Sequence, residues 1–117
     1  NLKTVEIWGT GKSKREFIYV DDVSKAILKF LFNKKLIKKN LYWLNIGMGS
    51  DLNIKNLYLK ISKLIGYKGN FVHNLNKPDG TARKLLNIRK AKNLGWTPKT
   101  KLINGLKKTI NWYIKNK

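Results

Sequence analysis

The stretch EFIYVDDVSKAILKF, from Glu16 to Phe30, changes its hydrophobic period partway along. Its beginning, Glu16–Val20, is rich in β-branched and aromatic residues and predicts a strand. After Asp21 and Asp22, which are interpreted as helix-capping and first-turn charges, a helix is predicted. Its apolar residues recur at helical spacing, at Val23, Ala26, Ile27, Phe30 and Leu31. A strand that leads directly into a helix is typical of α/β proteins.

The same alternation of strands and helices continues on both sides. Further strands are predicted at Thr4–Trp8, Tyr42–Gly47 and Asn70–Asn74. Further helices are predicted over Ile54–Ile65, near Arg89–Asn93 and from about Lys101 onward, with a lysine-rich link over Lys34–Asn40. The predicted fold class is therefore α/β, a class that hosts many functions.

Local signals mark where two of these helices begin and end. Asp51 or Asn53 is expected to cap the helix that starts at Ile54, because both side chains accept hydrogen bonds from a first turn. Gly66 is expected to end that helix, since glycine adopts the left-handed conformation of a C-terminal cap. Pro98 disfavours helix at Thr97 and predicts a break before the last helix.

The chain carries a formal net charge of +20, from 26 basic and 6 acidic residues. Such a charge favours a polyanionic partner such as nucleic acid or an anionic membrane. Only three of the basic residues are arginines, however, and arginine is the side chain that binds phosphates bidentately. The lysines are dispersed over predicted helix faces, where charges normally contact solvent. A solvent-exposed lysine surface is the favoured interpretation, and a polyanion-binding patch is the alternative.

A length of 117 residues allows at most one ordinary domain with a modest core. Neither a methionine nor a signal peptide precedes Asn1, so we expect the chain to be a piece of a longer gene product. The absence of cysteine excludes disulfides and thiolate metal sites and favours a cytoplasmic protein. No apolar run approaches the roughly 18 residues needed to cross a bilayer, so we expect a soluble protein without a membrane partner.

The stretch WGTGKSKRE, from Trp8 to Glu16, is the first candidate binding loop. Trp8 offers a flat ring that packs on a sugar or a base. Arg15 offers a planar fork suited to a pyrophosphate or a carboxylate. A tryptophan in the core and a surface arginine are the alternative interpretation.

The stretch KPDGTARKLL, from Lys77 to Leu86, is the second candidate. Its proline and glycine restrain the backbone, while Asp79 supplies an acceptor and Arg83 and Lys84 supply donors. A rigid polar loop of this kind suits hydrogen bonding to a nucleotide. A simple turn followed by solvated charges is the alternative.

Other motifs that carry chemistry are weaker. Gly47 and Gly49 lack the third glycine and the acidic ribose partner of a dinucleotide site, so NIGMG is interpreted as a structural turn. His73 is the only histidine, which excludes a histidine-based metal cluster or catalytic triad within the chain. Adjacent carboxylates at Asp21 and Asp22 do not converge on one scissile bond. No metal site is predicted.

Five stretches, taken in order, resemble the C-terminal part of the GDP-L-fucose synthase family of the extended short-chain dehydrogenase/reductase superfamily. They are WGTGKSKREFIYVDD, LNIGMGSDLNIKNL, IGYKG, KPDGTARKLL and LGWTPKTKLINGLKKTINWYIKN. REFIYVDDV and NIGMG indicate the superfamily, whereas WGTG with KREF, KPDGTARKLL and LGW narrow the resemblance to the fucose synthases. Ala82 and Asn87 depart from the family, which carries proline and aspartate there, and the lost proline relaxes the loop slightly.

The resemblance implies that residues 1–117 form the GDP-sugar-binding lobe of a Rossmann-type enzyme, with a strand and a helix that complete the cofactor domain. The family epimerises GDP-4-keto-6-deoxymannose and reduces it with NADPH. Trp8, Arg15 and Asp79 match family positions that contact the GDP-sugar, and Lys84 is placed with them. Arg15 is assigned to the pyrophosphate, Trp8 to the sugar-nucleotide, and Asp79 with Lys84 to the nucleotide end.

The family's catalytic machinery has no counterpart in this chain. Its glycine-rich NADP loop, its Tyr-x-x-x-Lys pair and its epimerisation cysteine and histidine are expected upstream of Asn1. No catalytic or cofactor-binding residue is therefore predicted here, and the isolated chain is expected to be inactive. It is also expected to be monomeric, although the family is homodimeric. Apolar surface near Phe17–Phe32 or Trp43–Ile46 is expected to be exposed without the NADP-binding domain.

Two alternatives to the fucose synthase interpretation are left open. The first is the substrate lobe of another GDP- or UDP-sugar epimerase or dehydratase. The second is a basic nucleic-acid-binding module that uses the lysines and aromatic stacking, which predicts steeply salt-dependent binding.

Overall fold

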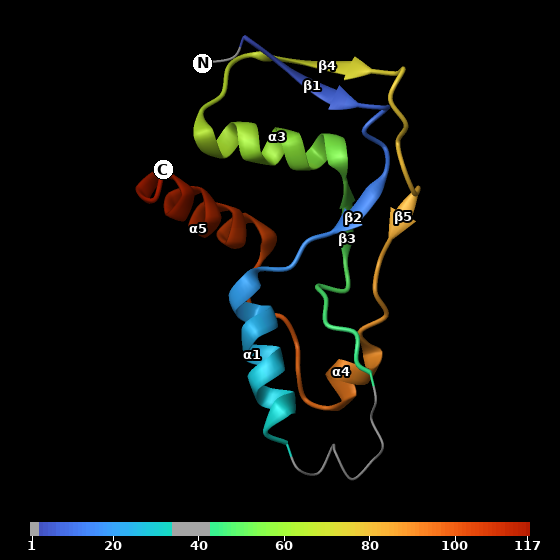
Figure 1. Cartoon of the computed structure of the whole chain (residues 1–117), viewed down its shortest axis with the longest axis vertical. Coiled ribbons are helices and arrows are strands. Elements are labelled where there is room, and N and C mark those ends of the chain that lie inside the picture. The colour runs from blue at the N-terminus through green and yellow to red at the C-terminus, as the bar shows by residue number, and fades with distance from the viewer. Residues whose placement is uncertain (1–2, 34–42) are drawn as a thin grey trace.

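The computed structural model describes residues 3–33 and 43–117 and shows an elongated α/β molecule (Figure 1). Its principal extents are 55 × 33 × 19 Å. Two small sheets follow one another along the long axis, and helices pack beside them (Figure 1). The predicted α/β class is confirmed, while the predicted link over Lys34–Asn40 lies outside the described residues.

A two-stranded parallel sheet closes one end of the molecule. Strand β1 (Thr4–Trp8) pairs with β4 (Asn70–Asn74), in register from Thr4 opposite Asn70 to Trp8 opposite Asn74. Both strands are confirmed. Ile7, in β1, is only 1% exposed because alternate side chains of a strand face the same side.

Helix α3 (Ile54–Ile65) lies beside this sheet and joins it to the rest of the chain (Figure 1). Its start is capped by Asn53, whose side-chain oxygen accepts the N–H of Asn56 at 2.7 Å. Its end is the predicted one, because Gly66 adopts a left-handed φ of 66°. The ring of Phe71 packs edge-on against Tyr58 of the helix, with centroids 5.6 Å apart.

A three-stranded sheet lies in the middle of the molecule. Strand β2 (Lys14–Glu16) is central, with β3 (Asp51–Asn53) antiparallel on one side and β5 (Arg83–Lys84) parallel on the other. The strand predicted over Glu16–Val20 is wrong beyond Glu16. Strands form where the backbone finds a partner, and the partners β3 and β5 are short, polar segments that carry no hydrophobic pattern.

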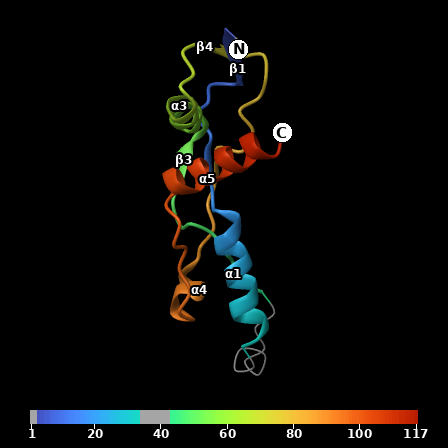
Figure 2. The same ribbon diagram turned by 90° about the vertical axis from the view of Figure 1, so that its left-hand side faces the viewer.

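Helices α1 (Val20–Leu31) and α4 (Arg89–Asn93) lie side by side at the other end (Figures 1 and 2). A small apolar core joins them. It contains the buried residues Ala26, Ala91 and Trp96, against which Ile18, Phe30, Leu44 and Ile46 pack. The strand predicted at Tyr42–Gly47 is not found over its described part, Trp43–Gly47, because no neighbouring strand in the described chain pairs with that segment.

The first turn of α1 carries the two predicted acidic residues, but they do not cap it. Tyr19 occupies the N-cap position without a side-chain hydrogen bond, so the predicted capping role is wrong. Asp22 is instead buried, and its carboxylate accepts the N–H groups of Lys99 and Thr100 at 3.0 and 2.7 Å. Burial raises the pKa of Asp22, but the hydrogen bonds from Thr100 and Lys99, together with the charge of Lys25, hold the pKa below its ordinary value.

Those hydrogen bonds fix the segment that leads into the last helix, α5 (Leu102–Lys115). The helix crosses Tyr19 at Gly105, where an added Cβ would lie 3.3 Å from the tyrosine Cβ. Asp22 therefore acts as a tether between the start of α1 and the start of α5. A carboxylate at a helix start is not distinguished from a cap by sequence alone, since the two partner N–H groups lie far along the chain.

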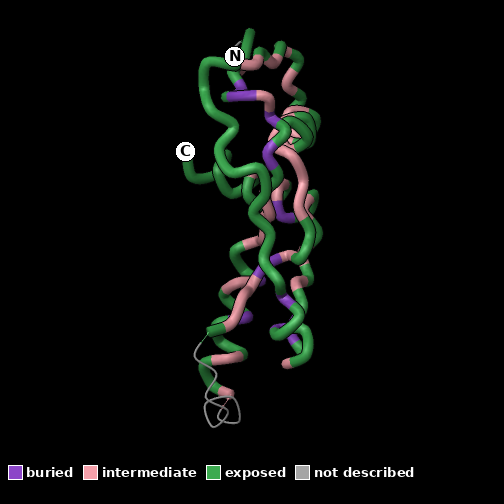
Figure 3. Tube along the Cα trace, turned by 90° about the vertical axis from the view of Figure 1, so that its right-hand side faces the viewer, coloured by how far each residue is buried: buried purple, intermediate pink, exposed green. Residues whose placement is uncertain are grey.

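Most of the described chain is exposed or of intermediate burial (Figure 3). Large apolar side chains are among the exposed ones. At the α1 end these are Val20, Ile27, Leu28, Leu31, Phe32 and Trp43. The expected exposure is thus confirmed for α1 and Trp43, whereas Leu44 and Ile46 pack on the core. In the described part of the chain, no helix is long and apolar enough to cross a membrane.

Candidate ligand-binding seam

Two segments that are distant in sequence run together along the middle of the molecule. We call Trp8–Glu16 and Lys77–Leu86 together the seam. The N–H of Lys14 donates to the carbonyl of Ala82 at 2.8 Å, and the strands β2 and β5 align Arg15 with Lys84. The loop KPDGTARKLL is therefore anchored along the length of WGTGKSKRE, which accounts for its combination of turn and charged residues.

Asp79 is bound tightly to the first half of the seam. Its Oδ1 accepts the N–H groups of Thr10 and Gly11 at 2.7 and 3.2 Å, and its Oδ2 accepts the Thr10 hydroxyl at 2.7 Å. Ser13 donates its hydroxyl to the Asp79 carbonyl at 2.6 Å. The hydroxyl of Thr10 is the main cause that lowers the pKa of Asp79, so the carboxylate is charged at neutral pH.

The turn that receives Asp79 depends on two glycines. Gly9 and Gly11 adopt left-handed φ angles of 67° and 68°. A Cβ at Gly9 would lie 2.9 Å from Cγ of Asp79, and one at Gly11 would lie 3.2 Å from Cε1 of His73. His73 supports the turn from beneath by donating from Nδ1 to the Gly9 carbonyl at 3.0 Å. A structural role for His73 therefore accounts for its position.

Arg15 and Lys84 lie opposite each other on neighbouring strands in the second half of the seam. Nη1 of Arg15 donates to the carbonyls of Lys14 and Thr81 at 2.7 and 2.6 Å, which fixes the plane of the guanidinium. A guanidinium has five N–H groups, and the three on Nε and Nη2 have no hydrogen-bond partner within residues 3–33 and 43–117. Three such donors beside the Lys84 ammonium have the chemistry that suits an anion.

Two further carboxylates, that of Glu16 in the seam and that of Asp51 beside it, accept hydrogen bonds from other groups of the protein. Glu16 accepts the N–H of Leu86 at 3.1 Å and also that of Gly49. Asp51 accepts from Nε of Arg83 at 2.5 Å. Arg83, expected in the sequence to be a ligand donor, is thus an ion-pair partner that joins β5 to β3.

Trp8 lies at the far end of the seam from Lys84 and is 62% exposed. The ammonium of Lys77 lies 5.2 Å from the centre of a Trp8 ring, a cation–π distance. Trp8 is therefore a surface residue rather than a core tryptophan. Gly9 contacts Asp79, so the neighbouring Trp8 lies near Asp79 at one end of the seam. At the other end, strand pairing places Arg15 beside Lys84.

Two of the cavities bear on the choice of site, and one of them contains two of the four predicted site residues, Arg15 and Lys84, but neither Trp8 nor Asp79. It has a volume of about 530 Å³ and is lined by Arg15, Glu16, Arg83, Lys84, Leu85 and Leu86. This volume is in the range of about 300–1,000 Å³ that is common for small-molecule sites. Among the described residues, no group of three or more His, Cys, Asp or Glu side chains is placed to hold a metal ion.

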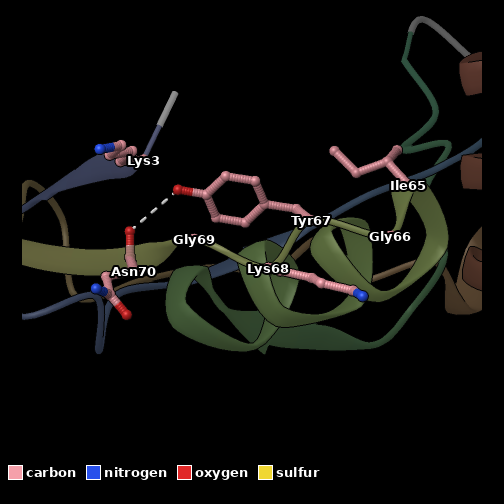
Figure 4. A pocket seen from close by; sticks show the side chains of 7 residues that line it. All are labelled: Lys3, Ile65, Gly66, Tyr67, Lys68, Gly69 and Asn70. Atoms are coloured by element: carbon pink, nitrogen blue, oxygen red, sulfur yellow. Dashed lines mark hydrogen bonds between the residues drawn. The ribbon is translucent and has the colours of Figure 1, made fainter. Parts of the chain in front are cut away.

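The other cavity, of about 630 Å³, lies where α3 ends and β4 begins (Figure 4). Its lining residues are Lys3, Ile65, Gly66, Tyr67, Lys68, Gly69 and Asn70, with no carboxylate among them. Tyr67 donates its hydroxyl to the Asn70 carbonyl at 3.2 Å, and Gly69 leaves room for the phenol (Figure 4). Its lining provides neither an acid–base pair nor an arginine fork, so the seam is the stronger candidate site.

The glycines of NIGMG do not fit the phosphates of a dinucleotide cofactor. The N–H of Gly49 donates to the Glu16 carboxylate, and a Cβ at Gly47 would lie 2.7 Å from a Glu16 oxygen. A pyrophosphate placed there would meet a negative charge where a phosphate cradle presents unpaired N–H groups. The segment is a structural turn, as its sequence predicts.

The sequence is similar to those of several known proteins. The model of the NAD dependent epimerase/dehydratase family matches residues 1–47. GDP-L-fucose synthase 1 of Arabidopsis thaliana is 41% identical over 112 residues, which cover 96% of this chain and 33% of the plant protein. The chain is similar to members of the NAD-dependent epimerase/dehydratase family in its N-terminal stretch, residues 1–47. Its resemblance to GDP-L-fucose synthases extends over nearly its whole length, at 36–41% identity.

Solved structures of similar proteins share the fold. A GDP-6-OMe-4-keto-L-xylo-heptose reductase from C. jejuni is 38% identical with a TM-score of 0.86, covering 98% of this chain and 35% of that one. A UDP-glucose 4-epimerase from Thermotoga maritima, solved with UDP-glucose, is 31% identical with a TM-score of 0.81, covering 96% and 35%. The chain spans 33–38% of the length of the GDP-L-fucose synthases that it matches.

The structure also contains seam residues that the sequence analysis did not single out. Thr10 and Ser13 hold Asp79, and Glu16 joins three segments through its two oxygens. A threonine between two glycines is the one local signal that points to a special turn. The partners themselves are about 70 positions away, so no local pattern identifies them.

Proposed function

We propose that this chain is the GDP-sugar-binding region of a GDP-L-fucose synthase, and that it acts within a longer polypeptide. The complete enzyme would epimerise GDP-4-keto-6-deoxymannose and reduce it with NADPH. The support is twofold: the resemblance to GDP-L-fucose synthases over 96–99% of the chain, and the arrangement of the seam. Residues of this chain would bind and orient the substrate, and the chemistry would take place on groups outside it.

The charge of the seam is the observation that carries the proposal. Asp79, Glu16 and Asp51 each accept hydrogen bonds from protein donors. One acceptor position on Asp79 remains, so the charges offered to a ligand are mainly cationic, and among the predicted site residues they are those of Arg15 and Lys84. A diphosphate needs this balance, because its two negative phosphates are matched by a planar fork and a point charge.

The two ends of the seam suit different parts of a GDP-sugar. We assign Arg15 to the pyrophosphate and Lys84 to the nucleotide end, since they are neighbours across β2 and β5. Trp8 is exposed and would pack its ring against the sugar-nucleotide. Asp79 would accept one hydrogen bond from the ligand, because three of about four acceptor positions on its carboxylate are already filled.

The rest of the enzyme would supply the NADP(H) site. NIGMG does not fit the cofactor phosphates, so no step of the reaction is derived through the cofactor here. The exposed apolar side chains of α1, together with Trp43, give the α1 end a surface suited to contact with such a further domain. We propose a cytoplasmic, homodimeric enzyme, in which these 117 residues alone would be inactive and monomeric.

A second candidate is a UDP-sugar enzyme of the same family. The observation that supports this candidate is the likeness to a UDP-glucose 4-epimerase, at 31% identity and a TM-score of 0.81. The two candidates differ in the base that the seam receives. Guanine and uracil present different donors, so the nucleotide preference separates them.

Calorimetric titration of GDP and UDP into the complete polypeptide tests the proposal. GDP is expected to bind at least about tenfold more tightly than UDP, since a site built to hydrogen-bond one base leaves polar groups unpaired with the other. Arg15→Ala and Lys84→Ala are each expected to weaken GDP binding about tenfold, because each removes a charge-assisted contact. Arg89→Ala and Lys92→Ala, which alter exposed residues of α4, are the matched controls.

Two outcomes would contradict the proposal. A preference for UDP would assign the chain to the second candidate. Absence of nucleotide-sugar binding, together with RNA affinity that falls steeply with salt, would indicate a nucleic-acid-binding module instead.

A further inference from the structure

Thr10 binds the Asp79 carboxylate through two of its groups, a contact that the sequence does not predict. Both its N–H and its hydroxyl donate to the same carboxylate, one to each oxygen, at 2.7 Å. The left-handed conformations of Gly9 and Gly11 on either side turn both groups of Thr10 toward Asp79. The hydroxyl also accepts the N–H of Lys12 at 3.2 Å, which fixes its own orientation.

This contact controls the one part of Asp79 that faces a ligand. Oδ1 already accepts two N–H groups, whereas Oδ2 accepts only the Thr10 hydroxyl. The direction of the remaining acceptor position on Oδ2 therefore depends on Thr10. Two backbone N–H groups hold Oδ1, but the Thr10 hydroxyl is the one donor to Oδ2 among the described residues, and the Asp79 residue is exposed.

A second hydroxyl holds the backbone of the same residue. Ser13 is buried and donates to the Asp79 carbonyl at 2.6 Å. The main chain then continues to Thr81, whose carbonyl fixes Nη1 of Arg15. Displacement of Asp79 is thus transmitted within two residues to the guanidinium that we assign to the pyrophosphate.

We propose that Thr10 is a positioning residue for nucleotide-sugar binding, which orients the Asp79 carboxylate through its hydroxyl and thereby aligns Trp8, Asp79 and Arg15 on one ligand. The inference rests on the proposed function of the seam. Thr10, a residue of the WGTG turn, would thus affect the affinity for the nucleotide-sugar without touching it.

Thr10→Val tests the inference, because it replaces the hydroxyl by a methyl group of nearly the same shape. Measured by calorimetry with GDP on the complete polypeptide, it is expected to weaken binding about five- to tenfold. Thr10→Ser keeps the hydroxyl and is expected to bind within about twofold of wild type. Thr4→Val makes the same chemical change at an exposed position of β1 and is the matched control.

The outcomes separate this inference from the proposed function. If wild type does not bind GDP, the proposed function fails. If wild type binds but Thr10→Val binds equally well, or Thr10→Ser loses as much affinity as Thr10→Val, the positioning role fails and the proposed function stands. If Thr10→Val does not fold, Thr10→Ala serves as the second variant, because it also removes the hydroxyl, and GDP affinity equal to that of wild type would overturn the inference.

Discussion

The two ends of the molecule hold their chains together in different ways. At the β1–β4 end, two strands predicted from the sequence find each other and pair in register over their whole length. At the α1 end, the strand predicted at Tyr42–Gly47 has no strand beside its described part, Trp43–Gly47, within the described chain. Helix α1 exposes large apolar side chains. At the first end, the two strands form hydrogen bonds with each other. The second end is held together mainly by a small apolar core.

The difference shows that strand-forming potential is not the same as a strand. Both segments carry the required apolar and β-branched residues, but a strand also needs a partner for its N–H and C=O groups. The end without that partner relies on Trp96 and on the Asp22 tether. Substitutions at these points are therefore expected to affect the two ends unequally.

Removal of the Trp96 side chain is expected to have the largest effect. Trp96 is 6% exposed and fills the core between α1 and α4. Trp96→Ala should lower the free energy of unfolding by about 3–5 kcal/mol, through lost burial and a cavity. Trp112→Ala alters a tryptophan that is 65% exposed and should cost about 0.5 kcal/mol or less. Urea denaturation measures both, and equal losses would contradict the assignment of the core.

Removal of the Asp22 carboxylate is expected to be the next largest effect. Asp22→Ala leaves the N–H groups of Lys99 and Thr100 without their acceptor and should cost about 2–3 kcal/mol. Asp21→Ala removes the neighbouring exposed carboxylate and is the matched control. Hydrogen exchange is expected to increase at the amides of Lys99 and Thr100 in the first variant only.

The Asp22 tether also predicts an acid dependence. The pKa of Asp22 is lower in the folded protein than its ordinary value of 3.8, so its contribution to stability is complete above that value. As the pH falls below 3.8, the unfolded state binds the proton first and the contribution is lost. The stability difference between wild type and Asp22→Ala should therefore shrink in this acidic range, and a constant difference would argue against the tether.

Substitution of Gly9 is expected to have the smallest of the three effects and to act on the seam. Gly9→Ala places a Cβ at a φ of 67° and against Asp79, so we expect a cost of about 2 kcal/mol. Gly66→Ala has nearly the same φ, 66°, but nothing within 4 Å of the new Cβ, so only the conformational strain of about 1 kcal/mol remains. Equal costs would show that Asp79 does not pack on the turn.

Much of the local structure is predictable from the sequence. The strands at Thr4–Trp8 and Asn70–Asn74, the helix over Ile54–Ile65 and its end at Gly66 all agree with the predictions. Their signals are the periodicity of apolar residues and the conformational freedom of glycine, which involve only near neighbours. The short strands β3 and β5 are missed because their residues are polar and only their partner makes them strands.

The candidate site divides in the same way. The residue types of WGTGKSKRE and KPDGTARKLL predict two separate candidate binding loops, and the resemblance to a family implies that Trp8, Arg15, Asp79 and Lys84 contact a ligand. Only the tertiary structure decides that Asp79 is held by Thr10, that Arg83 is neutralised by Asp51 and that Asp22 is a tether. The reason is physical: local propensities depend on adjacent residues, whereas the partner of a carboxylate is set by whichever donor the fold brings within hydrogen-bonding distance.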